Sequence, residues 1–447
     1  MRESVSAILI HEDDVFFIKR QSHLRAFPGY FSFPGGKVDK EDNREHKLSE
    51  QYGIEARFLH ALSRELDEEL NFDLDHKDNQ SLIKHISLLG EAITPDFNPH
   101  RFRNLYVKVY LNEKPSFSLD AGEIEKASWL KNEEAFEMYN NSKMLVVPPM
   151  ITILEDLARD INSNKIIDPN LKYDSAKEVP MIRPVHGIRQ FLPLSHTFPP
   201  ANRTNCFLIG DTDYVLVDPS PSDKDELEKL INSIEREVSF KDISKILLSH
   251  HHPDHHEFST DIAKRFNLSM SMTEDTHRRI LNKCGDEYFS CIKIDFIKEG
   301  DIICKDNGIN VIALETPGHD EGQVSLLRED LAWCIVFDLI QTIGTVVVGD
   351  DEGDMKKYFD SLRRIIKLNA DYIFPSHGIG IGGTHKLKAT LKHRLEREQS
   401  ISLYHNEGLN EDEILQKIYA QISPKLHKYA LKTIRAHLNK IQLYGLG

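Results

Sequence analysis

The ten residues LLSHHHPDHH, from Leu247 to His256, constrain this chain of 447 residues more than any other stretch. They place five histidines and one aspartate at the end of the apolar, strand-like run KILLS. Neutral imidazole is a common zinc ligand, and a neighbouring carboxylate adds a harder oxygen donor. Because a loop leaving a strand can turn its side chains in different directions, the stretch predicts metal ligands at a strand end.

Further donors follow downstream, each behind a turn or at the end of an apolar run. One lies in TPGHDEGQ, one in FPSHGIG, and one closes the run WCIVFD. The seven candidate metal ligands are His250, His252, Asp254, His255, His319, Asp338 and His377. The alternative is a solvated histidine-rich loop that binds metal adventitiously, and the donors from separate loops argue against it.

The order and spacing of these ligands resemble the metallo-β-lactamase fold superfamily, and VLVDPS at Asp218 is similar to its early strand-turn signature. The resemblance implies an αββα sandwich over residues 190–383 with two metal ions. One ion would be bound by His250, His252 and His319. The other would be bound by Asp254, His255 and His377, with Asp338 bridging the two ions.

Hydrolysis is the activity that this resemblance implies. Two divalent cations close together lower the pKa of a shared water toward neutrality and polarise the electrophile. The donor types predict zinc, although iron or manganese fits the same ligands, and Asp254 is the candidate catalytic residue. The chain departs from the family at Glu257, where many members have glycine. His251 and His256 have no role in the pattern, and we expect them outside the ligand set or at the surface.

A second informative stretch is SRELDEELNF, Ser63 to Phe72, which lies in a helical pattern. Glu65, Glu68 and Glu69 fall at i, i+3 and i+4, on one helical face. Three like charges on one face repel, so this face either meets water or is neutralised by a hard cation. Mg²⁺ or Mn²⁺ is the fitting cation, because both prefer oxygen ligands.

FSFPGG followed by RELDEELNF resembles the Nudix box, which implies a Nudix α/β/α sandwich over residues 1–155. By this resemblance Glu65, Glu68 and Glu69 bind the metal, and Glu68 and Glu69 are catalytic. The spacer between Gly36 and Arg64 is longer than the box requires. Two residues also differ from the Nudix box: Asp42 stands in place of its first glutamate, and Asn71 stands in place of its glycine.

The segment FFIKRQSHLRAFPGYFSFPGG has the spacing of the coenzyme A diphosphatase branch of Nudix enzymes. This similarity implies metal-assisted attack of water on a diphosphate. Arg20, Arg25 and Arg64 are the candidate substrate-binding residues, since guanidinium groups suit phosphate. A degenerate Nudix domain used for docking is the alternative, because the long spacer could move the metal helix away from the glycine turn.

Polar, irregular residues 156–189 predict a linker or a wrapping connection. Residues 384–447 predict three helices, a cap that resembles the winged-helix-like tail of lactamase-beta-like hydrolases, a group that includes endoribonucleases. A basic strip could bind RNA there, and its residues are Lys386, Lys388, Lys392, His393, Arg394 and Arg397. The alternative is an ordinary exposed face on helices that pack against the metallohydrolase domain.

Composition narrows the choice of partners. A formal charge of −15 opposes nonspecific attraction to RNA or to an anionic membrane. The sequence shows neither an apolar run long enough to span a bilayer nor the pattern of a secretory signal, so we expect a cytoplasmic location. Its five cysteines form no CxxC pair, so we expect reduced thiols.

The prediction is an α/β multidomain hydrolase acting on small molecules, with an ester or thioester substrate at the dinuclear site and a diphosphate, coenzyme A-like or a nucleoside diphosphate derivative, at the Nudix site. The alternatives are an endoribonuclease acting on single-stranded RNA and a metal-stabilised binding scaffold. The oligomeric state stays open.

Overall fold

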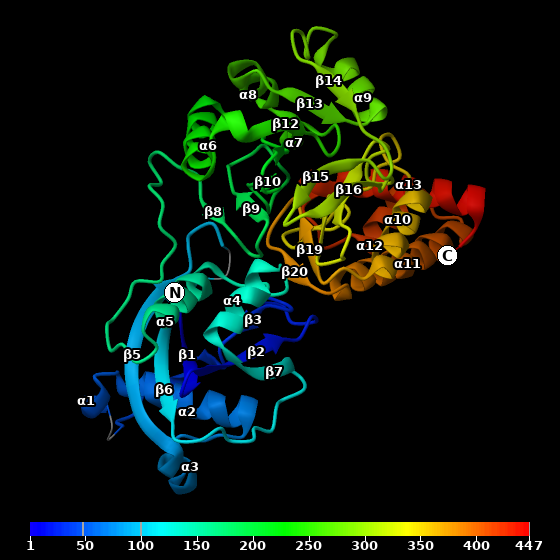
Figure 1. Ribbon diagram of the computed structural model, residues 1–447. Coiled ribbons are helices and arrows are strands. Elements are labelled where there is room, and N and C mark those ends of the chain that lie inside the picture. Colours follow the sequence, from blue (N-terminus) through cyan, green and yellow to red (C-terminus); the bar gives the residue numbers. More distant parts are fainter. Residues whose placement is uncertain (47–48, 99–100, 447) are drawn as a thin grey trace. The chain divides into compact units, whose positions relative to one another are not determined.

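The computed structural model describes residues 1–46, 49–98 and 101–446. The chain forms two compact units, Met1–Lys172 with Arg183–His186, and Tyr173–Ile182 with Gly187–Gly447 (Figure 1). The segment predicted as a linker or wrapping connection is divided between them. Ile167 donates its backbone N–H to the Leu89 carbonyl in the first unit, whereas Val179 lies in a core of the second.

The first unit is built on a mixed sheet in the order β3-β2-β1-β6-β5, with β4 paired to β1 and β7 paired to β2. Only the β1–β6 pairing is parallel among its described pairs. The strands are β1 (Arg2–His11), β2 (Asp14–Arg20), β3 (Phe31–Ser32), β4 (Gly35–Lys37), β5 (Ile83–Ile93), β6 (Phe102–Leu111) and β7 (Ile124–Lys131).

Helices cover both faces of this sheet. Alternate residues of β1 point to opposite sides: Val5, Ala7 and Leu9 pack in the core that contains α2 (Ala56–Leu70). Ile8 and Ile10 pack in the other core, which contains the helices α4 (Asn132–Asn140) and α5 (Pro148–Arg159). The connections carry the short helices η1 (Lys40–Asp42), α1 (Ser49–Tyr52) and α3 (Lys77–Leu82). The predicted α/β/α sandwich is confirmed.

The second unit contains two sheets. The first has the order β14-β13-β12-β11-β10-β9-β8 and the second runs from β15 to β20 in sequence order. The strands of the first sheet are β8 (Met181–Ile182), β9 (Ile188–Phe191), β10 (Cys206–Ile209), β11 (Tyr214–Val217), β12 (Ile243–Leu247), β13 (Ser269–Met272) and β14 (Ile294–Phe296). Those of the second are β15 (Ile302–Asp306), β16 (Ile309–Glu315), β17 (Val324–Arg328), β18 (Trp333–Phe337), β19 (Tyr372–Pro375) and β20 (Ile381–Gly382).

Each of these sheets has its own helical layer. The first packs against α6 (Lys224–Glu237), α8 (Ser259–Phe266) and α9 (Glu274–Cys284), and the second against α10 (Met355–Leu368). In α6 the buried residues recur at helical spacing, Leu227, Leu230, Ile231 and Ile234. This is the predicted αββα sandwich.

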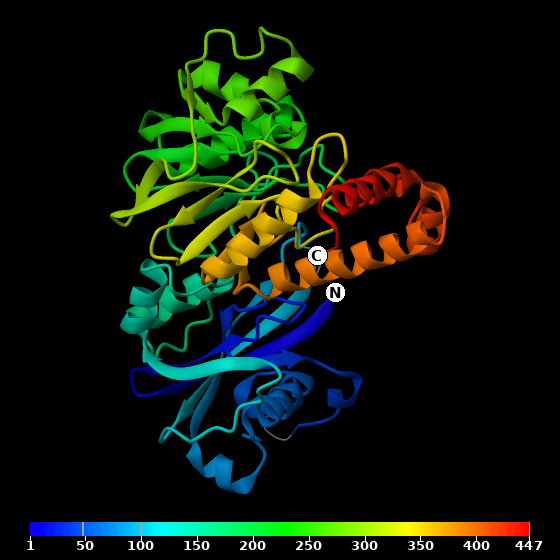
Figure 2. The same ribbon diagram turned by 90° about the vertical axis from the view of Figure 1, so that its right-hand side faces the viewer.

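The chain continues into three helices, α11 (His385–Asn406), α12 (Glu411–Ile418) and α13 (His427–Tyr444), with the turn η3 (Pro424–Leu426) between the last two. Figure 2 shows the long helices α11 and α13 in orange and red beside α10. Their shared core contains Ile401, Ile414, Leu415, Ala430 and Ile434. The predicted helices are present, and described residues 385–446 contain no strand, so no wing forms. No helix in the described residues has the length and apolarity needed to cross a bilayer.

Candidate metal centres

Three imidazoles meet beside the carboxyl end of β12. His250 and His252 follow that strand, and His319 lies in the loop between β16 and β17. The Nδ1 atom of His252 lies 3.0 Å from Nε2 of His250 and 3.0 Å from Nε2 of His319. Ligands of one tetrahedral zinc ion lie about 3.3 Å apart, given bonds of about 2.0 Å, so this spacing fits a shared ion.

A second group of donors lies next to the first. Asp254 and His255 belong to the short helix α7 (Pro253–His256), and His377 follows β19. The Asp254 Oδ2 atom lies 3.6 Å from His377 Nε2 and 3.9 Å from His255 Nε2. The three ligand atoms of this group all lie within 4.8 Å of one another.

Asp338 stands between the two groups. Its Oδ2 lies 3.6 Å from His319 Nε2, whereas its Oδ1 lies 3.4 Å from His377 Nε2 and 3.8 Å from His255 Nε2. The preceding residue, Phe337, ends β18 with a φ of 48°, a left-handed conformation that is rare for an aromatic residue and turns the chain at this point. The structure thus brings all seven candidate ligands together.

Asp218 orients two of the imidazoles. Its carboxylate, fully buried at the end of β11, accepts the Ser249 hydroxyl at 2.6 Å and lies 2.8 Å from Nδ1 of His255. Since the Ser249 hydroxyl donates to Asp218, it must accept from Nδ1 of His250, 3.0 Å away. Both Nδ1 atoms therefore carry hydrogen, and both Nε2 lone pairs face the cluster.

Backbone carbonyl groups fix the orientation of two more imidazoles, those of His319 and His377. His319 donates Nδ1–H to the Val347 carbonyl at 2.8 Å, and His377 donates Nδ1–H to the Arg203 carbonyl at 3.0 Å. A carbonyl can only accept, so Nδ1 of each ring carries hydrogen, Nε2 points inward, and in the neutral ring Nε2 has the lone pair.

His252 has the opposite orientation, with Nδ1 inward and Nε2 lying 3.1 Å from Oε2 of Glu352. Glu352 also accepts from Lys283 of α9 and lies 3.5 Å from His251. Sequence reasoning missed Glu352, because it stands 100 positions after His252 in a loop without periodic pattern.

These donors fit metal ions and do not satisfy one another. Nε2 of His255 is buried without a hydrogen-bond partner among the described residues, although carboxylate oxygens of Asp254 and Asp338 lie within 3.9 Å. The inward nitrogens and the carboxylate oxygens of Asp254 and Asp338 face one shared space, as the ligands of shared cations do. Cations resolve this arrangement, and imidazole with carboxylate is a donor set typical of zinc.

Electrostatics divide the imidazoles of the cluster into two sets. Burial opposes protonation of His255 and His377, but the carboxylates around them outweigh it and raise the pKa of His255 to about 9 and that of His377 above its usual value. Burial lowers the pKa of His250 well below its usual value and that of His319 to about 4, so both rings stay neutral. Burial alone would raise the pKa of Asp338, but His377 and the neighbouring rings hold it well below the usual range. His250, His319 and Asp338 are therefore in the forms that bind metal, whereas an ion at His255 and His377 must displace a proton.

The histidines outside the ligand pattern have other partners. His251 is buried and pairs with Asp320, while His256 lies with Nδ1 2.8 Å from the Tyr288 hydroxyl. Glu257, the departure from the family, lies 2.8 Å from Nδ1 of His196.

In the first unit, the glycine turn touches the acidic helix α2. The Gly35 N–H donates to Oε2 of Glu69 at 2.8 Å. A Cβ on Gly36 would lie 2.1 Å from Oε2 of Glu65, so only glycine admits this carboxylate. The long spacer has therefore not moved the helix away from the turn. Glu68 lies one turn after Glu65 and is exposed.

Arg64 binds its own chain. Its guanidinium donates to both oxygens of the buried Asp42 and to the Lys37 carbonyl, and its Nη1 lies 2.9 Å from Glu65 and 3.3 Å from Glu68. These bonds raise the pKa of Arg64 above its ordinary value, with the Asp42 bond as the largest cause. The guanidinium thus holds the carboxylates in position.

The other two predicted arginines differ in burial. Arg20, at the end of β2, has a buried Nε with no hydrogen-bond partner in the described part of the chain, and its charge acts on Glu69. Arg25 is exposed. Burial raises the pKa of Glu69 to about 8, against the opposing effects of the Gly35 N–H and of Arg20.

The predicted basic strip on α11 is only partly exposed. Arg394 is buried and donates to the Val346 carbonyl, and Arg397 donates to the Ile418 carbonyl and lies over the Tyr419 ring. Lys386, Lys388, Lys392 and His393 are exposed. Arg394 therefore joins α11 to the loop before α10, and Arg397 joins α11 to α12.

Comparisons with known proteins match both units. Residues 199–377 match the Metallo-beta-lactamase superfamily and residues 1–147 match the NUDIX domain. The Beta-lactamase-like protein 2 homolog of Caenorhabditis elegans is 24% identical over 242 residues, which are 53% of this chain and 78% of that protein. The hydroxyacylglutathione hydrolase of Rhodopseudomonas palustris (strain BisB5) is 27% identical over 165 residues, 36% of this chain and 58% of that protein.

A crystal structure shares the fold of the second unit. A Beta-lactamase domain protein from Burkholderia ambifaria has a TM-score of 0.52 and 19% identity, over 61% of this chain and 90% of that one. The chain joins a NUDIX domain to a domain of the metallo-beta-lactamase superfamily, and both families are hydrolases.

Proposed function

We propose that the second unit hydrolyses an ester or thioester of a small molecule at a dinuclear zinc centre, and that the first unit cleaves a diphosphate with Mg²⁺ or Mn²⁺. The observation that carries the proposal is the convergence of seven donors, five of which are imidazoles whose outward nitrogen has a hydrogen-bond partner. Side chains fixed in this way lose little further freedom when they bind ions.

In the second unit, metal ions would activate water and polarise the substrate carbonyl. His250, His252 and His319 would hold one ion, and Asp254, His255 and His377 the other. Asp338 would serve both, because its two oxygens face different groups. Asp254, whose Oδ2 faces the same space, would accept the proton of the attacking water as the new C–O bond forms. That proton would pass to the alkoxide or thiolate that leaves as the ester or thioester bond breaks.

A small acyl substrate agrees with two further observations. The R. palustris relative is named for hydrolysis of a hydroxyacylglutathione, which is a thioester. The chain carries a formal charge of −15, and two of the six members of the basic strip, Arg394 and Arg397, donate hydrogen bonds to backbone carbonyls of their own chain. Single-stranded RNA remains the alternative substrate, and the experiment below includes it. A cytoplasmic location stays a prediction.

For the first unit we propose that Glu65 and Glu69, beside the glycine turn, bind the cation with Glu68. Glu68 is exposed and is the proposed proton acceptor. Arg20 and Arg25 would bind the diphosphate, and a coenzyme A-like compound or another nucleoside diphosphate derivative is the proposed substrate. Arg64 would position the carboxylates, since its guanidinium already has four partners within the chain.

The test is hydrolysis of a substrate panel by the wild type, Asp254→Ala and Glu68→Gln. The panel contains coenzyme A, its acyl thioesters, acylglutathione, nucleoside diphosphate derivatives and single-stranded RNA. We expect thioester hydrolysis to be lost only in Asp254→Ala and diphosphate cleavage only in Glu68→Gln. RNA cleavage that only Asp254→Ala abolishes, without thioester hydrolysis, would establish the endoribonuclease instead.

A further inference from the structure

A second group of metal-type donors lies in the first unit, away from the acidic face of α2. His46 comes from the spacer between Gly36 and Arg64, His60 from α2, and Asp75 from the segment after α2. Their ligand atoms all lie within 4.8 Å of one another. Nε2 of His46 lies 3.2 Å from Oδ1 of Asp75, and the His46 and His60 rings have centroids 4.6 Å apart.

The hydrogen bond of His60 leaves a lone pair on its other ring nitrogen. Its Nε2 lies 3.1 Å from the Glu45 carbonyl oxygen, which can only accept, so Nε2 carries the hydrogen. Nδ1 then has a lone pair, and this atom is buried without a hydrogen-bond partner among the described residues. A buried acceptor without a donor destabilises the fold, and a bound cation would remove that cost.

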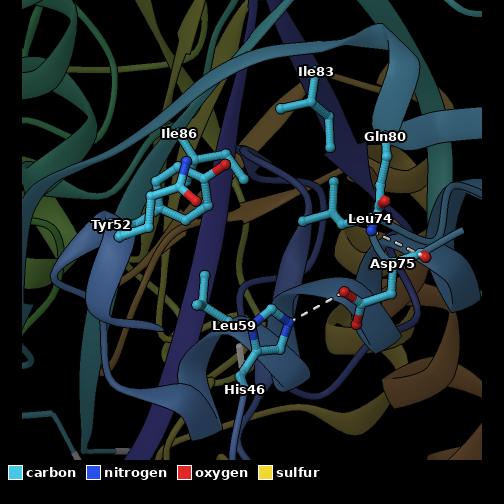
Figure 3. Close-up of a pocket in the computed structure, with 9 residues that line it drawn as sticks. His46, Tyr52, Leu59, Leu74, Asp75, Gln80, Ile83 and Ile86 are labelled. Carbon is cyan, nitrogen blue, oxygen red and sulfur yellow. Dashed lines mark hydrogen bonds and ion pairs between the residues drawn. The ribbon is translucent and has the colours of Figure 1, made fainter. Parts of the chain in front are cut away.

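The cluster opens to a cavity of about 250 Å³. Figure 3 shows His46 and Asp75 turned toward each other at one side of this cavity, with Tyr52, Leu59 and Leu74 nearby. The side chain of His46 is only 6% exposed. The cavity lies below the roughly 300–1,000 Å³ of typical ligand pockets, so it has room for water or a small ligand.

We propose that His46, His60 and Asp75 bind a divalent ion of the zinc class, with a fourth position that opens to the cavity. Two imidazoles and one carboxylate form a three-ligand set that leaves tetrahedral zinc one open position. Mg²⁺ prefers oxygen ligands, so the ion differs from the one proposed for Glu65, Glu68 and Glu69. Bonds of about 2.0 Å place donors about 3.3 Å apart, which side-chain rotations reach from the observed spacing.

The ion would join three segments that are distant in sequence. It ties the spacer to α2 and to the segment that follows α2, where Asp75 donates its backbone N–H to the Ser63 hydroxyl. The same spacer supplies Asp42 to Arg64, one helical turn after His60. Zinc would therefore stabilise the segment that positions the acidic face.

The test compares the zinc content of the full chain and of His60→Gln, after chelation, reloading with zinc and removal of excess ion. The matched control is His76→Gln, since His76 lies next to Asp75 but has a side chain that is 62% exposed. We expect about one zinc ion fewer per chain in His60→Gln, and no loss in the control. The seven donors of the second unit are unchanged in both variants, so the difference reports this cluster alone.

Asp75→Asn provides a second variant that keeps the size of the side chain. It should also lose about one zinc ion, while circular dichroism shows a folded chain. Zinc should raise the unfolding temperature of the first unit in the wild type and not in His60→Gln or Asp75→Asn. Equal zinc content in the wild type and His60→Gln, or an equal loss in His76→Gln, would overturn the proposal.

Discussion

At the residue scale, Glu352 gives His252 its orientation. His252 faces the cluster with Nδ1, unlike the other four imidazoles, and its Nε2 meets the Glu352 carboxylate. His251, His252 and Lys283 together lower the pKa of Glu352 far below its ordinary value, so the carboxylate is ionised. An ionised partner makes the imidazole more basic and fixes its tautomer.

Glu352→Gln should therefore weaken zinc binding about 10- to 100-fold, the usual effect of losing such a partner. Competition with a chromophoric chelator measures the affinity. Glu321→Gln is the control, because Glu321 forms a comparably exposed ion pair with Lys357 on the surface. If both variants bind zinc like the wild type, Glu352 does not orient a ligand.

Glu69 predicts a pH dependence for the first unit. Its pKa of about 8 means that it is mostly protonated at pH 7, and a cation must displace this proton. Mg²⁺ affinity should thus rise with pH, about tenfold between pH 7 and pH 9. Calorimetric titrations in buffers of different ionisation enthalpy should show proton release at pH 7. A flat profile without proton release would contradict this account.

At the element scale, two adjacent glycines of β4 are required for different reasons. A Cβ on Gly35, where φ is 138°, would lie 2.2 Å from the Val5 carbonyl oxygen, a rigid backbone atom. A Cβ on Gly36 would meet only the carboxylate of Glu65, the mobile end of a side chain. The first glycine therefore serves the fold and the second serves the site.

Gly35→Ala should destabilise the first unit by about 1–3 kcal/mol, as strained backbone does. Gly36→Ala should change stability by no more than about 0.5 kcal/mol, yet displace Glu65 and reduce diphosphate cleavage. Urea unfolding and activity measurements separate these effects. Loss of stability in Gly36→Ala with full activity would show that Glu65 is not a ligand.

The sequence predicted most elements whose pattern is local. The helical pattern around the acidic residues lies in α2, Ala56–Leu70, and the apolar run WCIVF is β18, Trp333–Phe337. Which side chains of α11 are exposed was harder to predict, because this depends on how the helix packs against the rest of its unit. Arg394 is buried there although its sequence neighbourhood is strongly charged.

At the scale of the whole molecule, a contact could be predicted only where a local sequence pattern marks the residues that form it. The donors were found because each stands at a strand end within a recognisable local pattern. The outer contacts of the centre, such as His319 with Val347 and His377 with Arg203, join loops that no local pattern pairs. The division of residues 173–187 between two units likewise rests on long-range contacts.

The central claim is that seven side chains of the second unit form one centre for two metal ions. The most direct measurement is a crystal structure of the zinc-loaded chain with anomalous data at the zinc edge. We predict two peaks, one among His250, His252 and His319 and one among Asp254, His255 and His377, with Asp338 between them. A single peak, or none at these side chains in a zinc-loaded crystal, would contradict the account.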